Sequence, residues 1–351
     1  MRFLSKRIFL VFIIASLSAL VLEGATRLFL SNKVPEPVIP NMGQFDEKLG
    51  WSKIPLTHGV SERTGYAVEY RINSKGLRDE ETTYKKPEDT FRIVLVGDSY
   101  TFGFGVPIEK HFSTLLEGYF QNVEVINMGI DGFGVDQELL YLKLEGFRYK
   151  PDLVLAYVPH YAEHRHMHIT RFGKNKPRYL LVNGNLILTH SPVVDNVPVR
   201  SAGVLREIDR WFVGRSKAYQ ILHDGLLGWV RQVPTVNQQR RQNSTNATDD
   251  GFMKEMHKLG ETIIYAMHED SLNHDAAFVL VTHIEELHEA ALKRQILSLN
   301  VSEPLSNPAF SLPYNLKHIN ESGNGVLAWE IAKFLQTHDL IPTKYLRDNK
   351  F

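Results

Sequence analysis

The stretch Phe91–Gly105 reads FRIVLVGDSYTFGFG, and it decides the fold class of this chain. Its first six residues form a run typical of a strand buried within a parallel sheet. A serine directly after such a strand projects from the carboxyl edge of the sheet, where open α/β folds place their ligands. The N–H groups of a following helix favour negative charge developing there. Ser99 is therefore a candidate nucleophile; the alternative is a plain strand–turn–helix in which Asp98 or Ser99 only caps the helix.

Further strand-like and helical segments alternate along the chain. This alternation predicts an α/β fold with a parallel sheet covered by helices on both faces. Asn183-Gly184 joins two apolar runs within Arg178–Thr189 and predicts a hairpin outside that sheet. The other strands are expected at Val123–Asn127, Leu153–Val158 and Ala277–Thr282, and the helices near residues 111–120, 136–147, 286–298 and 323–337.

The composition excludes several kinds of function. The 351 residues carry 40 Lys+Arg and 40 Asp+Glu, a formal charge of zero that disfavours nucleic-acid binding. The absence of cysteine removes disulfide scaffolds, cysteine-bound zinc and thiol nucleophiles. Covalent catalysis then has to use a hydroxyl, an amine, a carboxylate or an imidazole.

The N-terminus resembles a membrane-targeting segment. Three basic residues within Met1–Arg7 precede the uncharged run Ile8–Leu22. At about 1.5 Å per residue this run covers roughly 22 Å, the length of a signal-peptide core. Apolar residues resume after Glu23, however, and no A-x-A cleavage site follows. We predict a signal-anchor segment over residues 1–30, with a cleaved signal peptide as the alternative; both place the remaining chain outside the cytoplasm, membrane-anchored in the first case.

Three prolines within Ser31–Pro40 predict an extended linker over residues 31–44. The main domain is expected to span residues 45–345. A long insertion at about 160–260 interrupts its strand–helix alternation and is interpreted as a cap.

A histidine near the other end of the chain is the candidate partner of the serine. His318 is expected in a loop just before the last helix, within the pattern His-x-Asn-x-x-Gly formed with Asn320 and Gly323. A neutral imidazole within hydrogen-bond reach of Ser99 can take its proton during attack and return it to the leaving group.

Together these blocks resemble the SGNH hydrolases, the GDSL-like esterase/lipase superfamily. Gly97-Asp98-Ser99 matches the first block, Asn127–Gly134 the second, and Asn315-Leu316-Lys317-His318 the last. Leu49-Gly50-Trp51 and Asn73–Asp79 (NSKGLRD) are similar to the lead-in of membrane-anchored bacterial members. The resemblance implies a three-layer, flavodoxin-like fold, with the N-terminal membrane helix and the cap-like insertion added to it.

The same resemblance implies the site residues, with two departures. The N–H groups of Ser99 and Gly132 would bind the oxyanion. The third-block asparagine is missing, and the ring N–H of His160 is the hypothetical replacement donor. Asn315 stands where the family has its catalytic Asp; its carbonyl can orient His318 but supports the imidazolium less well, and some members work with a Ser–His dyad.

The implied function is an exported serine esterase or O-acyltransferase without a metal or other cofactor. Its substrates would be small esters or acylated carbohydrates, with O-acetyl groups of envelope or exported polysaccharide favoured by analogy. One alternative is a catalytically degenerate protein that binds glycan or assists polysaccharide assembly. Another is a metal hydrolase using a histidine cluster at i, i+4 spacing. That cluster comprises His160, His164, His166 and His168, with Glu163.

Overall fold

The computed structural model describes residues 14, 16–25, 42–63, 66–159, 164–195, 247–312 and 315–347. The chain divides into two compact units, Met1–Glu36 with Val197–Asp249, and Pro37–Asn196 with Asp250–Phe351. The described part of the first unit is mainly a helical segment over residues 16–25. No helix among the described residues has both the length and the apolar character needed to cross a bilayer. Most of the predicted signal-anchor and nearly all of the linker lie outside the described residues.

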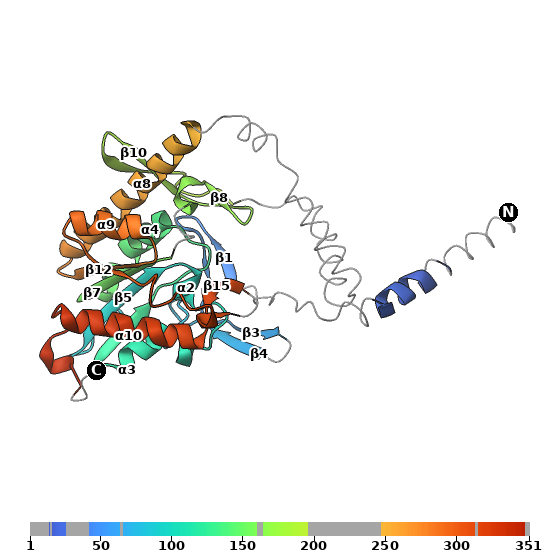
Figure 1. Cartoon of the computed structure of the whole chain (residues 1–351), viewed down its shortest axis with the longest axis horizontal. Helices are drawn as coiled ribbons and strands as arrows, with labels where there is room; N and C mark the ends of the chain where they lie inside the picture. The colour runs from blue at the N-terminus through green and yellow to red at the C-terminus, as the bar shows by residue number, and fades with distance from the viewer. Residues whose placement is uncertain are drawn as a thin grey trace. The chain divides into compact units, whose positions relative to one another are not determined.

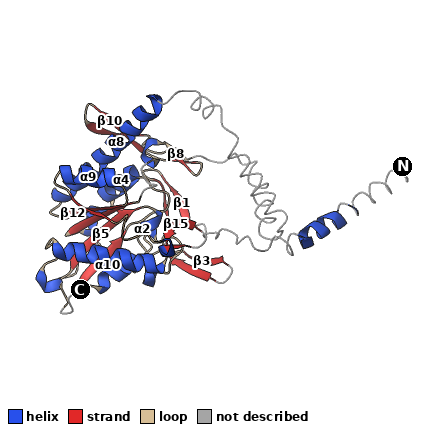
Figure 2. Ribbon diagram, viewed as in Figure 1, coloured by secondary structure: helices blue, strands red, loops and turns tan. Residues whose placement is uncertain are grey.

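A parallel sheet of five strands forms the centre of the second unit (Figure 2). Its strands are β5 (Phe91–Gly97), β6 (Val123–Asn127), β7 (Leu153–Val158), β12 (Ala277–Thr282) and β13 (Leu297–Asn300), and every neighbouring pair runs parallel. They lie in the order β13-β12-β7-β5-β6. The strand order therefore reverses between β5 and β7, and open α/β sheets bind ligands at such a switch point.

Alternate residues of the strands contribute to two separate cores, one on each face of the sheet. Val94 and Val96 of β5 belong to one core, while Ile93 and Leu95 belong to the other. This alternation follows from the two-residue period of a strand. Helices α4 (Val135–Leu144), α8 (Ala247–Leu272) and α9 (Glu285–Lys293) cover the first face, and α3 (Phe112–Gly118) and α10 (Glu321–Thr337) cover the second (Figure 1).

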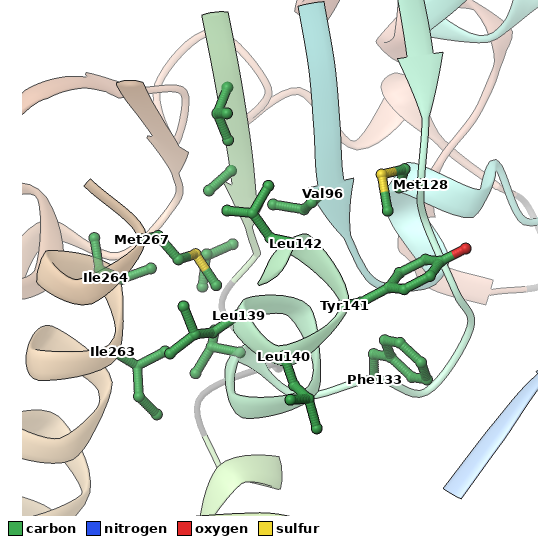
Figure 3. Packing of buried hydrophobic residues seen from close by; sticks show 14 of the residues in the cluster. Val96, Met128, Phe133, Leu139, Leu140, Tyr141, Leu142, Ile263, Ile264 and Met267 are labelled. Atoms are coloured by element: carbon green, nitrogen blue, oxygen red, sulfur yellow. The ribbon is translucent and has the colours of Figure 1, made fainter. Parts of the chain in front are cut away.

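The contact between α4 and α8 shows how the first face is closed. Leu139 and Leu142 of α4 lie beside Ile263, Ile264 and Met267 of α8 (Figure 3). All five side chains are almost completely removed from solvent. Burying a side chain of this size contributes about 1.5–3 kcal/mol, so this contact fixes the layer on which the loops of the site rest.

Short elements outside the central sheet complete the fold. The remaining strands pair as antiparallel two-stranded sheets, and α2 is a single helical turn. Their bounds are β1 (Gly43–Asp46) with β2 (Gly50–Lys53), β3 (His58–Arg63) with β4 (Tyr66–Arg71), β8 (Thr170–Arg171) with β9 (Lys174–Asn175), β10 (Arg178–Val182) with β11 (Asn185–Thr189), β14 (Ser311–Leu312) with β15 (Asn315–Ile319), α2 (Ser99–Phe102), and the 3-10 turns η1 (Ile108–Lys110), η2 (Gly146–Tyr149), η3 (Arg165–Met167), η4 (Pro308–Phe310) and η5 (Thr343–Tyr345).

The predicted strands and the hairpin match the observed ones closely, but one predicted helix is wrong in its second half. The sequence predicts a helix over residues 286–298, whereas α9 ends at Lys293 and β13 begins at Leu297. Gln295 between them has a φ of +60°, which no α-helix accepts. The chain therefore turns there and adds a fifth parallel strand.

The predicted insertion is described only in part, because residues 160–163 and 196–246 lie outside the described ones. Its first described part forms the two hairpins β8–β9 and β10–β11. Its last part is the beginning of α8, whose Met256 and Leu259 are buried in the core of the main fold. A cap over the site stays a prediction.

Candidate active site

Ser99 and His318 meet at the carboxyl edge of the sheet although 219 positions separate them in the chain. The Oγ atom of Ser99 lies 2.9 Å from Nε2 of His318, within hydrogen-bond distance. The side chain of Ser99 is 9% exposed, so the pair is sheltered but not sealed. This is the geometry that a serine nucleophile and its general base require, although their catalytic role stays a prediction.

The turn that carries Ser99 is fixed by the residue before it. Asp98 is fully buried and caps α2, since its Oδ1 accepts the N–H of Tyr100 at 3.0 Å. Its Oδ2 accepts a hydrogen bond from Nη1 of Arg165 at 2.6 Å. Both carboxylate oxygens of Asp98 are thus engaged in holding the turn. The macrodipole expected at Ser99 is small, because α2 has only four residues.

The imidazole of His318 packs against two aromatic rings. The ring of Tyr100 stacks on it with a centroid distance of 4.6 Å, and the ring of Phe104 lies 4.7 Å away. The sequence predicts a loop here, but His318 lies in the short strand β15. Strand pairing with β14 and the two rings together fix the position of the imidazole next to Ser99.

The other members of the His-x-Asn-x-x-Gly pattern have structural roles. The side chain of Asn320 caps α10 by accepting the N–H of Gly323 at 3.0 Å, and its Nδ2 donates to the carbonyl of Ala309 at 2.7 Å. A Cβ on Gly323 would lie 2.7 Å from the carbonyl oxygen of Phe310. The pattern therefore marks a tightly packed helix start that positions His318 two residues earlier.

The glycine-rich loop after β6 packs against the Ser99 turn. A Cβ on Gly129 would lie 2.2 Å from the backbone nitrogen of Phe102, so only glycine permits this approach. The N–H of Ile130 donates to the carbonyl of Gly97 at 3.2 Å. Gly132, the predicted oxyanion donor, lies in this loop with a φ of +83°. The loop is thus brought beside the nucleophile, while the donor role of Gly132 remains a prediction.

Arg165 links the turn that carries Ser99 to the glycine-rich loop after β6. Its Nη1 donates to Asp98 and also to the carbonyl of Phe133 at 2.7 Å. Glu138, the fully buried neighbour on α4, accepts no hydrogen bond from any described residue. Burial raises the pKa of Glu138 well above its usual range, and the negative charge of the nearby Asp98 adds to this effect. The positive charge of Arg165 opposes it. Arg165 is not among the predicted site residues, because nothing in the sequence places it near Asp98.

Arg78 supports the nucleophile turn from its other end. Its guanidinium is fully buried and donates to the carbonyls of Phe102 at 2.9 Å, of Val106 at 2.6 Å, and of Gly103. These carbonyls lie at or just after the C-terminal end of α2. Arg78 belongs to the stretch NSKGLRD (Asn73–Asp79), but its role as a positioning residue is evident only from the structure.

Two of the predicted site residues cannot be placed by their side chains. His160 lies outside the described residues, so its proposed oxyanion role stays a hypothesis. Asn315 begins β15, three residues before His318, but its side chain is outside the described part. Its orienting role likewise stays a prediction.

The described part of the histidine cluster does not adopt the helical spacing that a metal site would need. Arg165–Met167 form a 3-10 turn in place of an α-helix. His166 is buried, and its Nε2 lies 3.0 Å from the carbonyl of Met256 on α8. His164 and His168 are exposed, whereas His160 and Glu163 lie outside the described residues. Among the residues described, no group of three or more His, Asp or Glu side chains is arranged to hold a metal ion.

His111 connects the nucleophile helix to α3 and makes a pH-dependent contribution to stability. Its ring lies between Ser113 Oγ at 2.7 Å and the carbonyl of Tyr100 at 3.0 Å, and it is fully buried. Burial lowers the pKa of His111 to about 3. Because the unfolded chain takes up the proton near pH 6.5, this contribution is complete above pH 6.5 and is lost as the pH falls toward 3.

We therefore expect the wild-type protein to lose its stability advantage over His111→Gln in acid. The difference in free energy of unfolding should shrink by up to about 1.4 kcal/mol per pH unit below pH 6.5. Urea denaturation of both proteins between pH 7 and pH 4.5 measures it. Other groups with shifted pKa values, such as Asp79 and His166, are present in both proteins and cancel in the difference. A difference that stays constant with pH would contradict the assignment.

Comparisons with solved structures give matches at low sequence identity. No protein-family model and no curated protein matches the chain. Among solved structures, the chain is similar to the esterase EstA from Pseudoalteromonas sp. (12% identity, 70% of this chain and 97% of the other, TM-score 0.38). It is also similar to the lipase/acylhydrolase from Enterococcus faecalis (15% identity, 75% and 100%, TM-score 0.37). A third match is a member of the lipolytic protein G-D-S-L family from Veillonella parvula DSM 2008 (11% identity, 70% and 97%, TM-score 0.33). With TM-scores below 0.5, the activity of this chain has to be argued from its own residues.

Proposed function

We propose that this protein is a serine esterase or O-acyltransferase that forms an acyl-enzyme at Ser99. The observation that carries the proposal is the 2.9 Å distance between Ser99 Oγ and His318 Nε2 at the switch point of a parallel sheet. A hydrogen-bonded Ser–His pair is the shared element of serine hydrolases on unrelated folds.

In the proposed reaction, His318 accepts the hydroxyl proton while Ser99 Oγ attacks the ester carbonyl carbon. The tetrahedral oxyanion is bound by the N–H groups of Ser99 and Gly132, with His160 as the hypothetical third donor. Collapse of this intermediate breaks the ester C–O bond, and His318 returns the proton to the leaving alcohol. Water or a sugar hydroxyl then attacks the acyl-enzyme, which gives hydrolysis or acyl transfer respectively.

The finer features of the proposal come from the sequence. The basic N-terminus followed by an apolar run supports export and a membrane anchor, with the catalytic domain outside the cytoplasm. An exported enzyme meets acylated carbohydrate, so O-acetyl groups on envelope or exported polysaccharide are the proposed substrates. Asn315 is the proposed orienting residue for His318, and a dyad is sufficient where it does not act.

A fluorophosphonate probe tests the proposal directly, because it reacts with serines that are activated by a base. We expect one label per chain, located by mass spectrometry on Ser99, and its loss in His318→Gln. The folded state of that variant is checked by circular dichroism. A folded wild-type protein that takes up no label at Ser99 would reject the serine mechanism and favour the glycan-binding alternative.

A further inference from the structure

The hairpin formed by β8 and β9 presents an unusual residue at its tip. Phe172 and Gly173 connect the strands with φ values of +52° and +73°. Hairpin turns of this kind strongly prefer asparagine followed by glycine, because a bulky side chain is strained at a positive φ. The neighbouring hairpin has Asn183 and Gly184 in the same positions, with φ values of +51° and +84°. An aromatic residue kept in a strained position indicates a use other than forming the turn.

Phe172 lies beside the glycine loop of the site. A Cβ on Gly132 would lie 2.5 Å from Cε2 of Phe172, so the Cε2 edge of the ring packs against this glycine. The side chain is nevertheless 69% exposed. An exposed aromatic ring next to the predicted oxyanion glycine offers a flat apolar surface to a bound substrate.

Arg171, the residue before Phe172, supplies a positive charge. The guanidinium of Arg171 lies over the ring of Phe172, 4.4 Å from its centroid. Its Nε is shielded from solvent and has no hydrogen-bond partner among the described residues. Burial and the proximity of Arg165 lower the pKa of Arg171, and Asp98 only partly offsets this. Asp98 is already bonded to Arg165 and to the Tyr100 N–H, and no described carboxylate forms an ion pair with Arg171.

We propose that Arg171 and Phe172 form a subsite that binds an anionic group, a carboxylate or phosphate, carried by the ester substrate next to its acyl group. The proposal rests on the esterase function proposed above and specifies its substrate class. The planar guanidinium suits both anions, and the ring stacks against the sugar or aromatic ring that carries the anion. The ligand anion then supplies a counter-charge that none of the described carboxylates provides to Arg171.

Matched acetate esters test the charge preference. The probes are 4-acetoxybenzoate, 4-acetoxyphenyl phosphate and the uncharged methyl 4-acetoxybenzoate. For each protein, kcat/KM for an anionic ester is divided by kcat/KM for the uncharged ester. Comparing this ratio between a variant and the wild type cancels the intrinsic reactivity of the esters. In Arg171→Gln we expect the ratio to fall about tenfold relative to the wild type, the factor that about 1.4 kcal/mol represents. Loss with the carboxylate ester or with the phosphate ester identifies which anion is bound.

Lys174 provides the matched control, because it is exposed and pairs with Arg171 across the same hairpin. Lys174→Gln removes the same charge and should change the ratio less than twofold. An equal effect of both substitutions would show general electrostatic attraction and overturn the subsite. An equal loss with charged and uncharged esters in Arg171→Gln would overturn it too, by assigning Arg171 a positioning role.

A binding measurement separates this inference from the proposed function, because it needs no turnover. In a Ser99→Ala background, calorimetry should detect tetragalacturonate but not the uncharged maltotetraose. Adding Arg171→Gln should abolish this binding, whereas adding Lys174→Gln should not. If turnover does not depend on Ser99 but binding does depend on Arg171, the esterase proposal fails and the anion subsite stands. If no tetragalacturonate binds and the ester ratio is unchanged in Arg171→Gln, the subsite fails.

A substitution at Phe172 tests the role of the aromatic ring in binding. Phe172→Asn installs the residue that the turn prefers and removes the apolar surface. We expect an unchanged or higher Tm together with at least threefold weaker binding of tetragalacturonate. A lower Tm with unchanged binding would assign Phe172 to the fold and not to the ligand.

Discussion

Ser99→Ala should lower kcat for 4-nitrophenyl acetate by about three orders of magnitude or more, which is the largest effect we expect from any single substitution. The hydroxyl oxygen is the atom that forms the acyl bond in the proposed mechanism, and it lies 2.9 Å from Nε2 of His318. His318→Gln should lose about as much activity, because the hydroxyl is a poor nucleophile without its base.

The double variant distinguishes a working pair from two independent residues. Because the serine and the histidine act in the same step, Ser99→Ala with His318→Gln should be no slower than the worse single variant. Losses that multiply would show that the two residues act separately. Steady-state kinetics on the three variants measures this.

The chain offers a matched control for the broken hydrogen bond. Ser298 Oγ lies 2.8 Å from Nδ1 of His288, a second Ser–His contact, made between β13 and α9. Ser298 is buried as well. Ser298→Ala should leave kcat within about twofold of the wild type, because this contact lies outside the proposed site. Activity that survives Ser99→Ala would reject the proposed nucleophile.

The central strands could be predicted because their signal is local. The runs 123–127, 153–158 and 277–282 are strands with the predicted bounds, since residues that are mostly β-branched or apolar suit a buried parallel strand. β13 was missed because it has only four residues and follows a helix without a glycine or proline between them. Its strand character comes from pairing with β12, which the sequence alone does not show.

The site could be predicted only where residues follow a strand end or a recognisable block. Ser99 follows β5 directly, and the pattern around His318 marks the start of α10. Arg165 and Arg171 carry no such signal, because Arg165 acts through a contact with Asp98, 67 positions earlier, and Arg171 depends on the packing of its hairpin beside the site. Burial of an arginine depends on tertiary packing, and an arginine in a polar segment is ordinarily expected on the surface.

Arg78 is the basis of the second large effect, this time on stability. Arg78→Met keeps much of the side-chain volume but removes the side-chain donors to the buried carbonyls of Phe102, Gly103 and Val106. The carbonyl of Gly103 still accepts the N–H of Val106 at 3.3 Å, whereas those of Phe102 and Val106 lose their side-chain donor. Each buried acceptor left without a partner costs about 1–3 kcal/mol. We expect the free energy of unfolding to fall by about 3–5 kcal/mol, measured by urea denaturation at pH 7.

Arg71 provides the comparison, because it lies seven positions earlier and its side chain is 77% exposed. Arg71→Met should change the free energy of unfolding by no more than about 0.5 kcal/mol, as is usual for surface substitutions. If Arg78→Met were equally mild, water would have to replace the guanidinium at the carbonyls of Phe102 and Val106, and Arg78 would have no positioning role.

Activity at a temperature where each variant is fully folded separates positioning from stability. The three carbonyls lie at and after the C-terminal end of α2, and Ser99 is the first residue of that helix. Without the guanidinium the helical turn loses its support, so the Ser99–His318 distance should become more variable and kcat should fall about tenfold or more with little change in KM. Arg78→Lys restores the charge but not the planar set of donors, and should recover only part of kcat. Full recovery by lysine would mean that the positive charge, and not the geometry of the guanidinium, holds the nucleophile turn.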